Sequence, residues 1–203
     1  MNRLALWGVL VAAVSAGAPP VPSPWEVVRT EPDGLVLEAR STPDSAFSEL
    51  RVRATTSVSP AVVAERIWTR RADSVEGRLT ERSEVLYESD TERLLYVRLR
   101  LPAVSRRDYT MRYRRQVEPV KGAMRIDFAL DDAAGPAPTP EVVRMRLARG
   151  SWTIEPARGG GAIVTYQVLS DPAGNVPVWV ASGEQKEIAI QMVREVILPP
   201  LRR

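Results

Sequence analysis

Most of this chain alternates apolar and polar side chains with a period of two, which is typical of strands in an antiparallel sheet with one buried face. Two central segments show the pattern most clearly, over 93–101 and 109–117. Their apolar faces carry Leu95, Val97 and Leu99 in the first segment, and Tyr109, Met111 and Tyr113 in the second. Arginines fill the opposite faces, as on a solvated sheet surface. The same alternation fits a packed core and a cavity wall, so it leaves those two alternatives open.

The rest of the chain extends this pattern into a large sheet. We expect strands over 25–30, 34–40, 47–56, 80–88, 93–101, 108–118, 123–130, 142–148, 151–155 and 162–170. Ser59 and Pro60 suit the cap and first turn of a short helix. Three prolines mark 131–140 as a loop.

From Pro177 onward the period becomes helical. Apolar and small residues recur at spacings of three and four over 177–196, and Pro199 and Pro200 end the pattern. A long C-terminal amphipathic helix beside a large antiparallel sheet predicts an α+β fold in which the helix covers one sheet face.

The N-terminus predicts an export signal. Arg3 precedes an apolar run over 4–14, and Ala16-Gly17-Ala18 supplies small residues for cleavage near Ala18. The run is shorter than the about 20 residues of a membrane span. We therefore expect a signal peptide over 1–18, a proline-rich spacer over 19–24, one domain over 25–198 and a tail over 199–203, with the mature protein periplasmic or secreted.

The composition excludes several kinds of chemistry. The sequence has no Cys and no His, which removes disulfides, imidazole bases and metal sites built on these residues. The formal net charge is only +3 and no basic tract stands out, so we expect no nucleic-acid partner. We predict no catalytic residue, no metal and no cofactor.

Four motifs follow one another through the domain. They are Tyr96-Val97-Arg98-Leu99-Arg100-Leu101-Pro102, Ser105-x-Arg107-Asp108-Tyr109, Val143-Arg144 followed by Trp152, and Asp171-Pro172-x-Gly174-x-Val176-Pro177-x-Trp179. In this order and spacing the chain resembles the START (steroidogenic acute regulatory protein-related lipid transfer) domain, of the helix-grip group.

The resemblance implies a helix-grip fold, in which a curved antiparallel sheet wraps around the C-terminal helix and encloses a hydrophobic cavity. It implies binding of one lipid-like molecule without chemistry on it. The implied cavity wall is Leu95, Val97, Leu99, Tyr109, Met111 and Tyr113, and the implied lid helix presents Val178, Trp179, Ile188 and Met192.

The polar part of such a cavity differs from that of some members of the group. Some sterol binders of this group place an arginine where this chain has Tyr113, paired with an acid near Leu94 or Leu95, so that pair is absent here. The ligand head group is then expected to meet tyrosine hydroxyls or Arg149, unless a bulge at Gly150 redirects Arg149. Arg107 and Asp108 are neighbours on a strand, so they point to opposite faces and need separate partners.

Two other functions stay open at this stage. The chain could be a helix-grip enzyme acting on a hydrophobic substrate, or a scaffold protein whose cavity has collapsed. The predicted partners are a lipid or other hydrophobic small molecule and, transiently, a membrane, with the protein itself a monomer.

Overall fold

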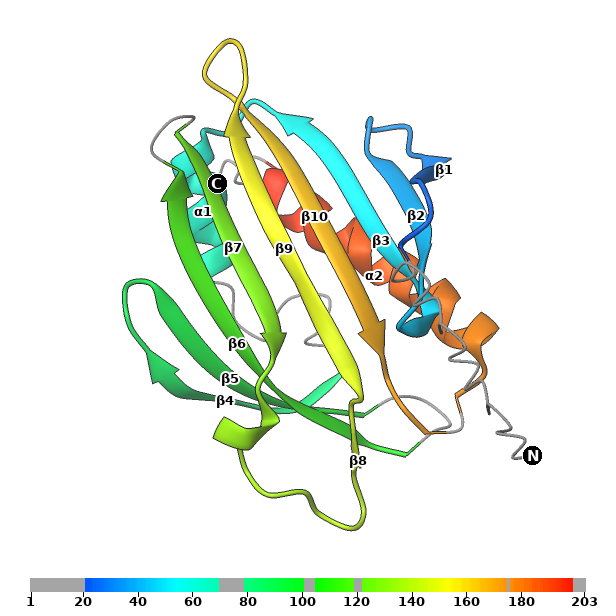
Figure 1. The fold of residues 1–203 in the computed structure, drawn as a ribbon. Coiled ribbons are helices and arrows are strands. Elements are labelled where there is room, and N and C mark those ends of the chain that lie inside the picture. The colour runs from blue at the N-terminus through cyan, green and yellow to red at the C-terminus, as the bar shows by residue number, and fades with distance from the viewer. Residues whose placement is uncertain (1–20, 70–78, 101–104, 119–121, 175, 199–203) are drawn as a thin grey trace, which may run out of the picture.

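The computed structural model describes residues 21–69, 79–100, 105–118, 122–174 and 176–198, without the side chains of 118 and 179–181. These residues form one ten-stranded sheet with two α-helices (Figure 1). The strands are β1 (Glu26–Thr30), β2 (Val36–Thr42), β3 (Ser45–Thr56), β4 (Thr80–Glu88), β5 (Glu92–Leu99), β6 (Arg107–Glu118), β7 (Ala123–Leu130), β8 (Val143–Arg144), β9 (Leu147–Pro156) and β10 (Ala162–Asp171). The helices are α1 (Pro60–Trp68), α2 (Val178–Ile197) and the short 3₁₀ turn η2 (Asp132–Ala134).

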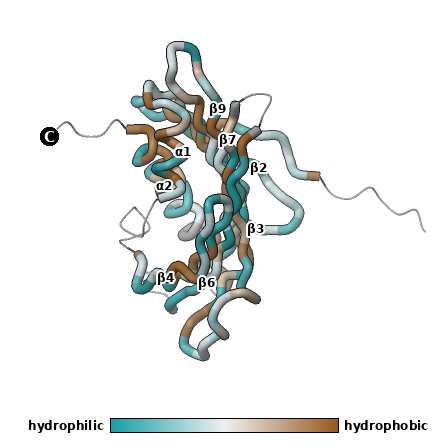
Figure 2. Tube along the Cα trace, turned by 90° about the vertical axis from the view of Figure 1, so that its left-hand side faces the viewer, coloured by the Kyte–Doolittle hydropathy of each residue, from teal (hydrophilic) through white to brown (hydrophobic). Residues whose placement is uncertain are grey.

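The sheet is antiparallel except at one short strand. Its order is β1-β2-β3-β10-β9-β7-β6-β5-β4, and β8 adds a parallel pairing to β6. The sheet curves, and α1 and α2 both lie on the same side of it (Figures 1 and 2). This confirms the predicted α+β helix-grip fold, in which a curved sheet holds the C-terminal helix.

The predicted boundary within the ninth strand is wrong. We expected separate strands over 142–148 and 151–155, but β9 is continuous through Gly150. A Cβ at Gly150 would lie 2.5 Å from the Phe128 ring and 2.1 Å from the Gln167 carbonyl oxygen. Glycine therefore lets the strand run on beneath the Phe128 ring, where a side chain would clash.

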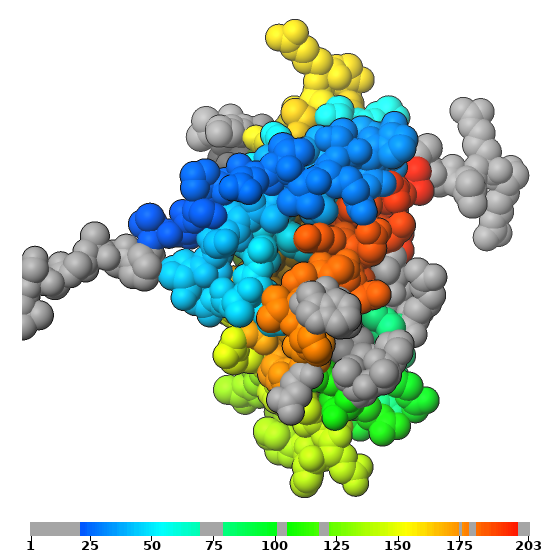
Figure 3. Space-filling model, turned by 90° about the vertical axis from the view of Figure 1, so that its right-hand side faces the viewer, coloured from blue at the N-terminus to red at the C-terminus, as the bar shows by residue number. Residues whose placement is uncertain are grey.

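The core lies between the concave sheet face and the helices. In α1, Ser59 takes the cap position without a side-chain hydrogen bond, Pro60 opens the helix, and Val63 and Trp68 are buried. The carboxyl end of α2 packs against β3, with Ile190 and Val193 almost fully buried. Figure 3 shows α2 in orange and red lying beside the blue and cyan β1–β3. No helix of the described residues is long and apolar enough to span a membrane.

Candidate functional site

A cavity of about 410 Å³ lies between the concave face of the sheet and α2. This volume is in the lower part of the range of about 300–1,000 Å³ for small-molecule sites. Its wall includes residues from β3, β5, β6, β7, β9, β10 and α2 and from the link between β8 and β9, among them Leu50, Leu99, Tyr109, Met111, Tyr113, Phe128, Met145, Ala148, Trp152, Tyr166, Val168, Ile188 and Met192. Most of these side chains are apolar, so the cavity suits a hydrophobic molecule.

Four aromatic rings form a continuous part of the wall. Trp152 stacks on Tyr166 with ring centroids 4.3 Å apart, and the Tyr166 ring lies 6.0 Å from the Phe128 ring. Phe128 in turn lies 5.7 Å from Tyr113. Strand pairing fixes this row, because Tyr166 lies opposite Trp152 and Tyr113 lies opposite Phe128. Rings held this way present a rigid apolar surface to a ligand.

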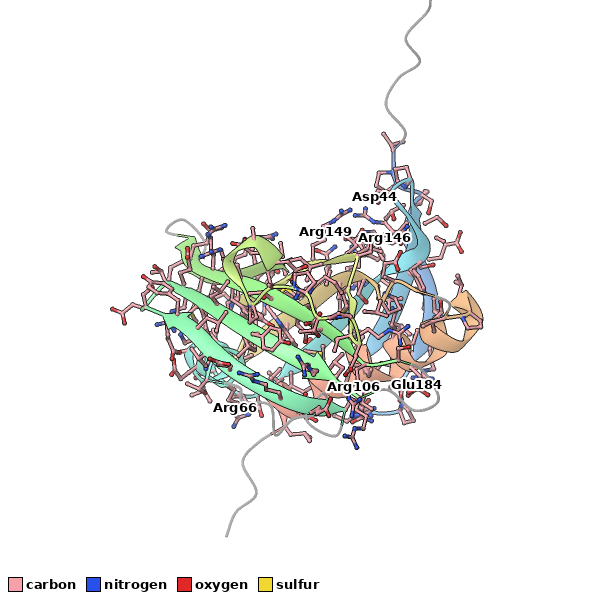
Figure 4. The ribbon with its side chains drawn as sticks, turned by 90° about the horizontal axis from the view of Figure 1, so that it is seen from below. Asp44, Arg66, Arg106, Arg146, Arg149 and Glu184 are labelled. Atoms are coloured by element: carbon pink, nitrogen blue, oxygen red, sulfur yellow. The ribbon has the colours of Figure 1, made fainter. Side chains whose placement is uncertain are left out.

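The opposite end of the cavity is more polar. Ser170 of β10, Ser48 of β3 and Gln185 of α2 line it, and the Gln185 Nε2 donates a hydrogen bond to the Ser170 carbonyl oxygen at 3.2 Å. Glu184 lies at the same end with its side chain exposed. Glu184, labelled in Figure 4, belongs to the first turns of α2. The cavity is therefore apolar inside and polar toward the β10–α2 connection.

Arg107 and Asp108 point to opposite faces, as their adjacent positions on β6 predict. Asp108 turns away from the cavity, accepts hydrogen bonds from Arg144 Nε at 2.7 Å and from the Tyr96 hydroxyl at 3.0 Å, and is 1 % exposed. The hydrogen bond to Asp108 raises the pKa of Arg144 above its usual value. This pair links β8 to β6 on the face of the sheet that points away from the cavity.

Arg107 instead lies in the cavity wall and is 2 % exposed. Its guanidinium donates to two backbone carbonyl oxygens, that of Ser105 and, at 3.3 Å, that of Ala173 in the β10–α2 connection. Burial lowers the pKa of Arg107 below its usual value, with no acid offsetting the change. The sequence predicts only that Arg107 needs a partner separate from Asp108, and its place in the cavity was not predicted.

The structure brings six of the predicted site residues together at the cavity. These are Leu99, Tyr109, Met111 and Tyr113 of the sheet, with Ile188 and Met192 of α2. Two others do not reach it, because Leu95 and Val97 pack into the core farther along β5. Val178 is 42 % exposed at the start of α2, and the side chain of Trp179 lies outside the described residues.

Arg149 is the clear correction. It was predicted to face the cavity in phase with Met145 and Leu147, yet it lies on the outer face and forms an ion pair with Asp44 at 2.6 Å. The alternation changes phase between β8 and β9, so Met145 and Ala148 point inward while Arg149 points outward. Figure 4 shows Arg149 and Asp44 next to each other on the side of the sheet away from Glu184.

The prediction missed Phe128, Trp152 and Tyr166, which make most of the aromatic wall. The signal was present in the alternation of their own strands, for example Val164, Tyr166 and Val168 in β10. The predicted wall came from the alternation of β5 and β6, with Arg149 of β9 as the one addition. Applying the same period to β7, β9 and β10 would have found them.

Comparison with known structures settles the fold. A STAR-related lipid transfer protein from Xanthomonas axonopodis superimposes with a TM-score of 0.72 at 23% identity, covering 85% of this chain and 96% of that one. The protein has the START fold. Human StAR-related lipid transfer protein 5 matches with a TM-score of 0.72 at 14% identity, covering 85% of this chain and 84% of its own. A human lipid transfer and protein localization domain matches with a TM-score of 0.69 at 16% identity, covering 87% of this chain and 90% of that one.

Sequence comparison adds nothing to this likeness. No family model matches the chain, and no curated protein matches its sequence. At these low identities the likeness shows the fold alone. The ligand must therefore be argued from the residues of this chain.

Proposed function

We propose that this START-fold protein binds a lipid or other hydrophobic small molecule in its cavity and carries it without chemical change. The observation that carries the proposal is the cavity itself, about 410 Å³ in volume and lined mainly by apolar and aromatic side chains. The lipid transfer proteins that share the fold support the same class of ligand. An open cavity also favours binding over the collapsed-cavity scaffold.

The chemistry of the wall favours carriage over catalysis. The sequence has no His or Cys to act as base or nucleophile. Glu184 is the one carboxylate among the described residues of the wall, and its side chain is exposed to solvent. Acid–base catalysis by a pair of carboxylates would need a second acidic residue beside Glu184, and the described residues of the wall include none.

Extraction of the natively purified protein, followed by mass spectrometry, tests the proposal directly. We expect a bound hydrophobic molecule, or a rise in melting temperature when lipids are added to the empty protein. Ligand at 100 times its Kd stabilises the folded state by about 2.7 kcal/mol. A protein that is empty and shows no shift with any lipid of a broad panel would overturn the proposal.

A cavity-filling variant sharpens the test. Met111→Trp adds volume at a wall position, so we expect it to abolish ligand binding while the protein still folds. Val117→Trp on the same strand is the matched control, because Val117 is 64 % exposed. In a tightly packed core, overpacking would instead cost roughly 1–3 kcal/mol. Melting temperature and lipid binding measured on the same samples separate these outcomes.

We also propose that the protein acts after export, in the periplasm or outside the cell, as a monomer that contacts membranes transiently. The predicted signal over 1–18 and spacer over 19–24 fall mostly on residues that the structure does not describe, so they stay predictions. N-terminal sequencing of the protein from its native host should find a start close to Pro19. A soluble cytosolic protein that retains Met1 would overturn export.

A further inference from the structure

Arg107 is unlike the other arginines whose pKa is perturbed. Arg29, Arg98, Arg112, Arg144 and Arg194 all have a pKa raised by hydrogen bonds to partners, mostly acids. The pKa of Arg107 is lowered, and the cause is burial. Among the described residues, no carboxylate forms an ion pair with it.

The hydrogen bonds of Arg107 are also incomplete. Its two hydrogen bonds go to the carbonyl oxygens of Ser105 and Ala173. Its Nε is buried and has no partner among the described residues. A buried polar group without a partner is costly, and a guanidinium stays charged at any pH a protein meets. Within the described part of the chain, the Nε therefore lacks an acceptor and the guanidinium lacks a balancing negative charge.

The surroundings of Arg107 place it at the polar end of the cavity. It pairs with Leu99 on β5, and its Nη2 reaches Ala173 in the connection between β10 and α2. Gly174 follows with φ +67°, and a Cβ there would lie 3.1 Å from the same Nη2. Glycine thus lets the connection close over the guanidinium. The aromatic row of Trp152, Tyr166, Phe128 and Tyr113 forms another part of the same wall.

We propose that Arg107 binds the anionic head group, a carboxylate or a phosphate, of a single-chain amphiphile whose apolar tail lies against the aromatic wall. This inference rests on the proposed function and names its ligand class. The guanidinium matches the paired oxygens of either anion, and its unpartnered Nε supplies a donor. The volume of about 410 Å³ favours one chain, since it is near the lower limit for small-molecule sites.

Four probes with the same alkyl chain test this: hexadecanoate, hexadecyl phosphate, hexadecanol and methyl hexadecanoate. Titration of the delipidated full-length protein should give a Kd for at least one anion that is about tenfold or more below that of hexadecanol, because a hydrogen bond to a charged group is stronger than one between neutral groups. Whichever anion binds more tightly identifies the head group. If all four bind equally, the anion site is overturned while hydrophobic carriage stands. If none binds, the single-chain amphiphile is overturned, and the proposed function then depends on the broad lipid panel described above.

Variants separate recognition of the head group from support of the loop. Arg107→Gln should remove the preference for the anions and leave the Kd of hexadecanol unchanged within about twofold. Arg107→Lys should restore part of the preference, because it keeps the charge and loses the planar fork. Arg106→Gln is the matched control, since Arg106 lies next in sequence and pairs with Glu81 at 2.7 Å outside the cavity. If Arg107→Gln weakens all four probes in equal proportion, Arg107 only holds the loop and the proposal is wrong.

Discussion

The two halves of α2 do different work, although they form one continuous helix. The carboxyl half is held on several sides: Ile190, Val193 and Val196 are at most 3 % exposed, and Arg66 donates to the Val196 carbonyl oxygen at 3.0 Å. The amino half lies over the cavity. Its described side chains are exposed or half-buried up to Ile188.

The two halves of α2 also differ in their polar contacts at the surface. Arg194, in the carboxyl half, bonds Asp33 at 2.7 Å and Glu31 at 3.1 Å in the turn before β2. In the amino half, Glu187 pairs with Arg29 of β1 at 2.8 Å on the exposed surface, and Gln185 makes one hydrogen bond to β10. The helix begins after Pro177 without a side-chain cap. Local opening costs least where buried contacts are fewest. We therefore propose that only the amino half of α2 acts as a lid, while the carboxyl half is part of the core.

Two isoleucines in α2 give the largest expected contrast. Ile190 is 1 % exposed in the core, so Ile190→Ala should lower the free energy of unfolding by about 2–5 kcal/mol. Ile188 borders the cavity, so Ile188→Ala should lower the free energy of unfolding clearly less than Ile190→Ala does, and it should weaken ligand binding. Denaturant unfolding and ligand titration on both variants measure this. Equal losses of stability would mean that the two halves are packed alike.

Arg66 gives the next effect. Its Nη1 bonds the carbonyl oxygens of Val196 and Leu198 at the end of α2, so Arg66→Gln should cost about 1–2 kcal/mol through loss of charge-assisted bonds and of a favourable charge at the helix terminus. Arg82→Gln is the control, because Arg82 pairs with Glu84 on the exposed surface and should cost less than about 1 kcal/mol. Ligand release should be unchanged in both. Faster release from Arg66→Gln would place the gate at the carboxyl end.

The smallest effect is expected from acid. A hydrogen bond from Arg194 lowers the pKa of Asp33, and one from Arg29 lowers the pKa of Glu187. Because both folded-state pKa values lie below the unfolded ones, these pairs stabilise the protein at neutral pH, and the gain is lost as the pH falls below about 4. In Asp33→Asn, the free energy of unfolding should therefore fall less steeply as the pH is lowered through the acid range. An acid limb identical to that of the wild type would show that Asp33 contributes nothing.

The alternation of the strands predicted a large antiparallel sheet covered by the C-terminal helix, and the face of several wall residues. The helix-grip arrangement and its cavity were predicted from the resemblance of the four motifs to the START domain. Met111 and Tyr113 reach the cavity because period two fixes their face once the sheet is correct. Arg149 was misplaced because the joint between β8 and β9 shifts the phase by one residue, which turns every later side chain over. Leu95 and Val97 lie opposite Met111 and Tyr109 on the neighbouring strand, but they pack into the core instead of the cavity. How far a cavity extends across a sheet depends on where α2 lies, which the alternation does not show.

Arg107 could not be assigned from sequence for a different reason. Its neighbours in the chain show which face it takes, but not whether an acid from another strand meets it there. In the structure, Asp108 forms an ion pair with Arg144 of β8. Among the described residues, Arg107 has no such partner of opposite charge, and its Nε has no hydrogen bond. Partners across a sheet are a tertiary property that no local pattern carries.

Release of ligand from cross-linked proteins tests the half-helix lid most directly. The chain has no Cys, so a short bis-maleimide bridge can join Ser170→Cys to Gln185→Cys across the amino half, or Asp33→Cys to Arg194→Cys across the carboxyl half. The dissociation rate of a bound fluorescent lipid is measured before and after bridging. The account predicts that the first bridge slows release strongly and that the second leaves it unchanged. Release at the wild-type rate from the first, or blocked release from the second, would contradict it.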